Sequence, residues 1–146
     1  MTTYTDLRNR LAASLADDSS LTFTEAIYQE AIRRALERIG YVYALKLTIA
    51  GLDSAATTTL ADKDIPCLLS GAAGLALTAI LHIRFTTFTP SLMEDVALRM
   101  RTDKLLEEFN NMLDALRIET MQVAEEPPHS ALEWDESYFH DPEVEY

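Results

Sequence analysis

The first forty residues show hydrophobic positions at helical spacing. One stripe, which predicts a short helix ending near Ala16, consists of Tyr4, Leu7, Leu11 and Leu15. Residues Thr22–Glu25 match a capping box, so a second helix is expected to begin there. The apolar face of this second helix consists of Tyr28, Ile32, Ala35, Leu36 and Ile39. Gly40 follows that face directly and is expected to end the helix.

The spacing of hydrophobic residues changes to two after Gly40. The alternating apolar positions are Tyr41, Tyr43, Leu45, Leu47 and Ile49. A period of two is typical of a strand, residues 51–54 are suited to a turn, and residues 56–60 are suited to a return strand. The sequence therefore predicts a β-hairpin at about residues 41–60. The alternative, in which the second helix continues through Leu47, is disfavoured because Gly40 interrupts it.

An uncharged segment from Ile65 to Ile83 follows, in which only His82 is titratable with a charge near neutral pH. The acids before it and Pro66 favour a helix start. Its length approaches the ~20 apolar residues that cross a bilayer, but the charges that flank it show no clear Lys/Arg asymmetry. Its small residues, which allow close helix packing, are Gly71, Ala72, Ala73, Gly74, Ala76 and Ala79. We therefore expect the central helix of a bundle rather than a membrane or interfacial segment.

A long helix is expected after this segment. Residues Ser91–Glu94 form a second capping box, and no Gly or Pro occurs from Leu92 to Met121, which allows a helix ~45 Å long. Its apolar stripe consists of Leu98, Leu105, Phe109, Met112, Leu113 and Leu116. The predicted fold class is mainly α, a small bundle of about four helices with a β-hairpin between helices 2 and 3 and an extended C-terminal tail.

Charge divides the chain of 146 residues into a helical domain, residues 1–122, and a tail, residues 123–146. The chain has 12 Lys and Arg against 24 Asp and Glu, and eight of the acids lie in the tail, which has no Lys or Arg. The net charge of -12 therefore leaves -4 on the body, which disfavours a grip on nucleic-acid phosphates. Three prolines disfavour a helix in the tail. Its apolar residues, the predicted partner-binding set, include Leu132, Trp134, Tyr138, Phe139 and Tyr146.

No motif of an enzyme is present. The chain has no Walker A loop, no G-x-G-x-x-G and no G-x-S-x-G sequence. Cys67 is the only cysteine, so no internal disulfide is possible, and its apolar surroundings predict an inert packing thiol. His82, His129 and His140 stand too far apart in sequence to suggest a metal site, and His82 is expected in the core or an interface. We predict neither catalytic residues nor a cofactor or metal.

The one compact basic group is Arg33, Arg34 and Arg38, which alternates with Glu30 and Glu37. Such a pattern is typical of a salt-bridged helix face with pairs four residues apart. It also suits a docking patch for an acidic partner such as the tail.

The order of these elements resembles the head-to-tail adaptor (connector) proteins of tailed bacteriophages. The likeness covers most of residues 4–121 and includes the capped second helix, Glu25–Arg38. It is a likeness of pattern rather than of a diagnostic motif. The resemblance implies a structural virion neck protein, assembled in the bacterial cytoplasm. Such a protein docks under the portal protein as a homo-oligomeric ring, usually of twelve copies, and continues the DNA channel toward the stopper or tail-completion protein, without an active site.

Two other functions remain open at this stage. An acidic inhibitor or DNA mimic of phage origin would carry its acids across one folded face, whereas a third of the acids here lie in the tail. A small membrane-associated protein would be built around Ile65–Ile83.

Overall fold

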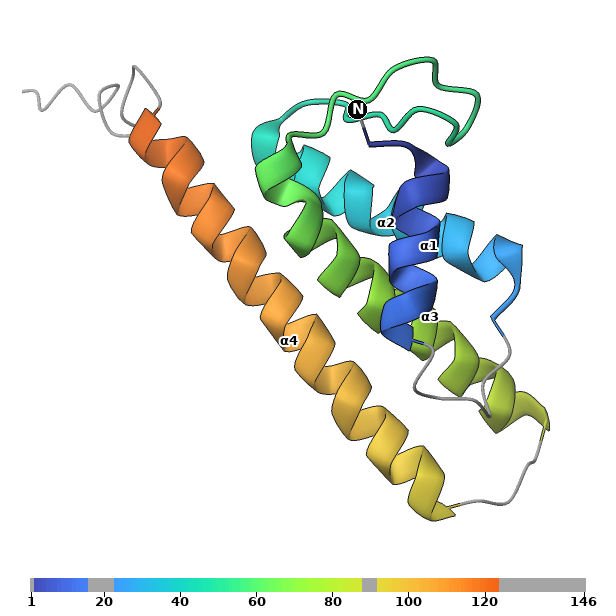
Figure 1. The fold of residues 1–146 in the computed structure, drawn as a ribbon. Coiled ribbons are helices and arrows are strands. Elements are labelled where there is room, and N and C mark those ends of the chain that lie inside the picture. The colour runs from blue at the N-terminus through green and yellow to red at the C-terminus, as the bar shows by residue number, and fades with distance from the viewer. Residues whose placement is uncertain (1, 16–22, 88–91, 124–146) are drawn as a thin grey trace, which may run out of the picture.

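The computed structural model describes residues 2–15, 23–87 and 92–123, which form a mainly helical body (Figure 1). The elements are α1 (Tyr4–Leu15), α2 (Glu25–Tyr43), a 3-10 turn (Asp62–Asp64), α3 (Ile65–Thr87) and α4 (Leu92–Val123). Within these residues, the predicted class and the four predicted helices are confirmed. Val123 is the last residue of α4, and the rest of the predicted tail, residues 124–146, lies outside the described residues.

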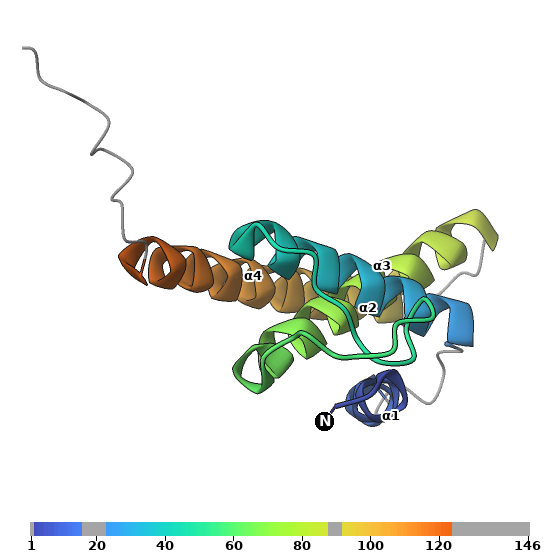
Figure 2. The same cartoon turned by 90° about the horizontal axis from the view of Figure 1, so that it is seen from above.

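Helix α3, which contains the uncharged segment Ile65–Ile83, is the centre of the fold, as predicted. It packs against α1, α2 and α4, while α1 and α4 lie on different sides of the α2–α3 pair (Figures 1 and 2). α3 and α4 are antiparallel, and an ion pair of 2.7 Å between Lys63 Nζ and Glu119 Oε1 joins the start of one to the end of the other. Arg101 of α4 also reaches α1, where its Nη2 donates to the carbonyl oxygen of Ser14 at 3.2 Å.

Small residues of α3 allow α4 to approach closely, as the sequence predicted. A Cβ atom at Gly74 would stand 2.8 Å from Leu106 Cδ2. The stripe of α4 that faces α3 has its most deeply buried residue at Phe109, while the polar residues Glu107, Glu108, Asn111 and Asp114 are exposed. The periodic patterns of α1, α2 and α4 are confirmed by the burial of their apolar stripes.

The predicted β-hairpin at residues 41–60 is wrong. α2 continues through Gly40 to Tyr43, and no strand forms among the described residues, which contain only an isolated parallel bridge between Thr3 and Ala50. Ala44 caps α2 in the left-handed region, with φ 52°, and the amide of Leu45 donates to the carbonyl oxygen of Gly40 at 3.0 Å. The alternative of a longer helix is therefore closer to the structure, although the helix ends before Leu47.

Threonine hydroxyls occupy the positions where a hairpin would place backbone partners. The amide of Thr48 donates to Thr59 Oγ1 at 2.8 Å, and the amide of Ala50 donates to Thr58 Oγ1 at 2.9 Å. The hydroxyl of Thr58 donates in turn to the carbonyl oxygen of Thr2 at 2.6 Å. Between the two predicted strand segments there is a single backbone hydrogen bond, from the amide of Thr59 to the carbonyl oxygen of Thr48. Residues 44–61 therefore form an irregular loop held by side chains.

Two helix boundaries differ from their predicted positions. Thr24, not Thr22, caps α2, with its hydroxyl accepting from the amide of Ile27 at 3.4 Å, so the helix starts two residues later. α3 continues to Thr87, four residues beyond Ile83, where the uncharged segment ends. Its last turns are not covered on all sides, since Ile83 and Phe85 are exposed.

Candidate functional site

The only cysteine is a packing residue in this structure, as predicted. Cys67 is buried near the start of α3. Burial and the nearby Asp64 carboxylate raise the pKa of the Cys67 thiol to about 11. The thiolate, which is the reactive form, is therefore scarce at neutral pH.

Asp64 is a buried acid, and its partner explains why it is tolerated there. Its two carboxylate oxygens accept from the hydroxyl of Tyr43 at 3.1 and 3.0 Å. The pKa of Tyr43 is raised, mainly by burial and to a smaller extent by this hydrogen bond. The contact joins the last residue of α2 to the residue before α3. Its role is therefore structural, because it fixes the end of one helix beside the start of the next.

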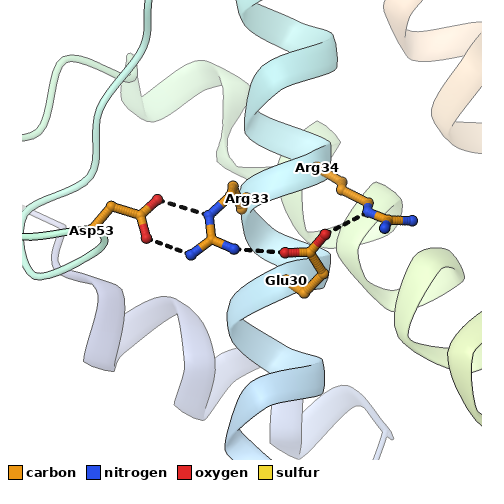
Figure 3. A network of polar contacts seen from close by, with 4 residues as sticks. All are labelled: Glu30, Arg33, Arg34 and Asp53. Carbon is orange, nitrogen blue, oxygen red and sulfur yellow. Dashed lines mark hydrogen bonds and ion pairs between the residues drawn. The ribbon is translucent and has the colours of Figure 1, made fainter.

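The basic group on α2 is a salt-bridged face whose pairing differs in part from the prediction (Figure 3). Arg34 Nε donates to Glu30 at 2.7 Å, which confirms the expected pair four residues apart. Arg33 does not pair with Glu37; its Nη1 donates to Glu30 at 2.6 Å, and its Nε donates to Asp53 at 2.8 Å. A second bond from Arg33 Nη2 makes the contact with Asp53 bidentate.

This network fixes the loop beside α2. Asp53 and Ser54 both have positive φ, 50° and 65°, a conformation that residues other than glycine rarely adopt. The guanidinium of Arg33 lowers the pKa of Asp53 and holds this turn against the helix. Arg38 lies over the ring of Phe109 at 5.9 Å. All three arginines are therefore engaged inside the chain rather than presented as an open basic patch.

His82 is exposed on α3, so of its two expected places the core is wrong, and the interface stays a prediction. In the described part of the chain, no group of three or more His, Cys, Asp or Glu side chains is placed to hold a metal ion.

The span Asp62–Thr86 is long and apolar enough to cross a membrane, and most of its apolar window is buried inside the protein. The core helix of a soluble protein passes the same test.

Two groups of exposed apolar residues lie at opposite ends of the α3–α4 pair. We call the first the turn patch; its residues lie near the point where α3 ends and α4 begins, and they are Ile83, Phe85, Val96 and Met100. Arg99 lies over the ring of Phe85 at 4.6 Å, which joins the two helices at this end. We call the second the terminal patch; it consists of Ile118, Met121 and Val123.

An acidic stretch separates the two patches on the outer side of α4. Its exposed acids are Asp103, Glu107, Glu108 and Asp114. The inward stripe of α4 was predicted from its periodic pattern, whereas the two patches were not. Their exposure depends on where α3 ends, which the pattern of α4 does not contain.

The predicted partner-binding residues Leu132, Trp134, Tyr138, Phe139 and Tyr146 lie outside the described residues, so their role stays a prediction. No family model, curated protein or solved structure matches this chain.

Proposed function

We propose that this chain is a structural protein that assembles as a ring, and that the ring is a head-to-tail adaptor of a tailed bacteriophage. The observation that carries the proposal is the pair of apolar patches at opposite ends of α4. Contact between unlike surfaces of successive copies forms a ring when the rotation closes. Pairing of the turn patch of one copy with the terminal patch of the next covers both.

The element order supports the assignment to an adaptor. A short helix, a capped helix, a buried helix, a long amphipathic helix and an acidic tail follow one another as in the family that the sequence resembles. A loop in place of the hairpin departs from that pattern. Because the loop is tied to α2 by Arg33 and Asp53, it is still a defined surface for a neighbouring subunit.

The charge of the chain is compatible with a channel through which DNA passes. A net charge of -12 gives no basic stripe to hold phosphates, and the outer side of α4 carries exposed acids. Negative charge repels the DNA backbone, so a genome moves past such a surface without being bound.

A variant of the terminal patch tests ring formation. Met121→Glu places a charge on an exposed apolar position, so the fold is expected to stay intact while self-association, or assembly on the portal, is lost. Asn111→Glu is the matched control, because it adds the same charge to an exposed polar position of the same helix. Masses are measured by native mass spectrometry, alone and with the portal ring of the virus that encodes the chain.

The two arms separate the proposal from its competitors. Loss of assembly in Met121→Glu and full assembly in Asn111→Glu support the ring. A stable dimer as the largest species, equal behaviour of the two variants, or a chain that stays monomeric with the portal ring would contradict it. The last outcome would favour an acidic inhibitor, and partition of the unmixed protein into detergent would favour a membrane role for α3.

A further inference from the structure

A groove runs between the outer face of α2 and the loop that follows it. Its volume is about 740 Å³, within the ~300–1,000 Å³ typical of ligand pockets. Its apolar floor is formed by Leu36, Leu47 and Leu52, of which Leu36 and Leu52 are buried. Tyr41 and Leu45 stand at its rim and are among the most exposed apolar residues described. An apolar floor with an exposed apolar rim is suited to an aromatic side chain.

The groove is held open by contacts already described. Arg33 and Asp53 both line it, and their bidentate contact keeps the loop at a fixed position beside α2. Gly40 also lines it; a Cβ atom there would stand 2.7 Å from the carbonyl oxygen of Leu45, so a larger residue would displace the loop. The hollow is therefore built into the fold.

The charges that line the groove favour an acidic segment beside Lys46. Within the groove, Asp53 is neutralised by Arg33, whereas exposed Lys46 forms no ion pair with any residue that the structure describes. Glu37 is the acid of α2 that lines the same groove. A segment that brings an aromatic ring to the leucines and carboxylates to Lys46 would satisfy both sets of groups.

The C-terminal tail has that composition and starts at the same end of the molecule. Trp134 is flanked by Glu133 and Asp135. A short series of contacts places its origin near the groove: Val123 follows Glu119 by one helical turn, Glu119 pairs with Lys63, and the next residue, Asp64, accepts from Tyr43 at the end of α2. Trp134 is eleven residues beyond Val123 and, at ~3.3 Å per residue, reaches up to about 36 Å.

We propose that the groove binds the tail of the same chain, with Trp134 on the leucine floor and the flanking carboxylates beside Lys46. The covalent link favours the same chain over a neighbour, since eleven residues of chain hold Trp134 at a high effective concentration near its own groove. The inference does not depend on the function proposed above, because it concerns the isolated chain.

Trp134 is the only tryptophan, so the fluorescence of the full-length chain reports on the tail alone. We expect emission shifted to the blue of free tryptophan, and quenching by acrylamide that is several-fold weaker. Leu45→Asp should abolish both effects. The matched control is Asn111→Asp, because it adds the same charge at an exposed position of α4 that neither lines the groove nor belongs to either apolar patch. Circular dichroism checks that both variants keep their helices.

A mixing experiment distinguishes binding of the tail to the groove of its own chain from binding to the groove of a neighbouring chain. The wild-type chain is refolded from urea with a tenfold excess of the double variant Leu45→Asp, Trp134→Phe, which has neither the groove nor the fluorophore. Emission should stay blue-shifted if each tail occupies its own groove. A red shift on mixing would assign the tail to a neighbour and overturn the proposal. Solvent-like emission of the wild type, or blue-shifted emission that survives Leu45→Asp, would also overturn it.

Discussion

Gly71 of α3 leaves the space that the ring of Phe109 of α4 occupies. A Cβ atom at position 71 would stand 2.6 to 2.7 Å from three carbons of that ring, and Phe109 is fully buried, so the ring cannot turn aside. Arg38 of α2 lies over the same ring. This contact sets the distance between α3 and α4 and joins three helices at one point.

Gly71→Ala is therefore expected to destabilise the fold, by about 1–3 kcal/mol, as overpacking of a core does. The sign is informative because Ala is preferred over Gly in a helix by about 1 kcal/mol when no contact interferes. Urea unfolding followed by circular dichroism measures the change. In a Phe109→Leu background the penalty should shrink, and a more stable Gly71→Ala chain would show that the two helices are further apart than described.

The Arg33–Asp53 contact is expected to control the loop rather than the global stability. Arg33→Ala should accelerate hydrogen exchange at the amides of Gly51 and Ala55, which bond within the turn, while the core amides of α3 keep their protection. Arg34→Ala is the control, since Arg34 pairs only with Glu30 among the described residues.

The same contact predicts an acid-sensitive turn. Arg33 lowers the pKa of Asp53 from its ordinary value of 3.8. A lowered pKa means that the stabilisation is present above pH 3.8 and is lost as the pH falls through the lower value of the folded state. Amide chemical shifts of residues 51–55 should therefore titrate below pH 3.8 in the wild type, and at a higher pH in Arg33→Ala, where the guanidinium no longer favours the carboxylate of Asp53. Equal titration of the two proteins would contradict the assignment.

The buried thiol predicts a loss of stability in alkali. The pKa of Cys67 is about 11 in the fold against an ordinary value of 9.0, so its protonated form is favoured by folding. That contribution is complete below pH 9 and is lost as the pH rises to 11, on the order of 2–3 kcal/mol. The free energy of unfolding should fall less steeply over this range in Cys67→Ala than in the wild type. Identical slopes would place the thiol in water.

The tail is expected to serve assembly rather than folding. Removal of residues 124–146 should leave the helical content of the body unchanged but abolish binding to the portal ring. Trp134→Ala should weaken that binding more than Glu133→Gln, because loss of the ring that holds the tail in the groove of its own chain disturbs the docked subunit more than loss of one screened surface charge. Titration of each variant against the portal ring measures the difference. Assembly of the truncated chain at wild-type affinity would remove the tail from this role.

The helices could be predicted from the sequence because their information is local. The stripe Leu7, Leu11 and Leu15 repeats at the helical period, and α4 has no Gly or Pro to stop it before Met121. The hairpin could not be predicted correctly, because Gly40 has a tertiary role. Gly40 has no side chain at the point where the carbonyl oxygen of Leu45 passes close to α2. The residues next to Gly40 in the sequence do not distinguish this packing role from that of a glycine that ends a helix.

The surfaces of the candidate site were less accessible to sequence reasoning. The partner of Arg33 is Asp53, twenty residues away in the loop, although Glu37 stands at the usual helical spacing. Likewise, Val96 and Met100 are exposed because of how α3 and α4 meet. Such facts depend on contacts between distant segments, which a periodic pattern does not record.

Native mass spectrometry of the full-length chain with a bacteriophage portal ring tests the proposed adaptor function most directly. The account predicts a discrete complex in which the portal gains one complete ring of this chain, twelve copies by the family resemblance. No gain in mass at micromolar concentration, or a gain of one or two copies with no closed ring, would contradict it.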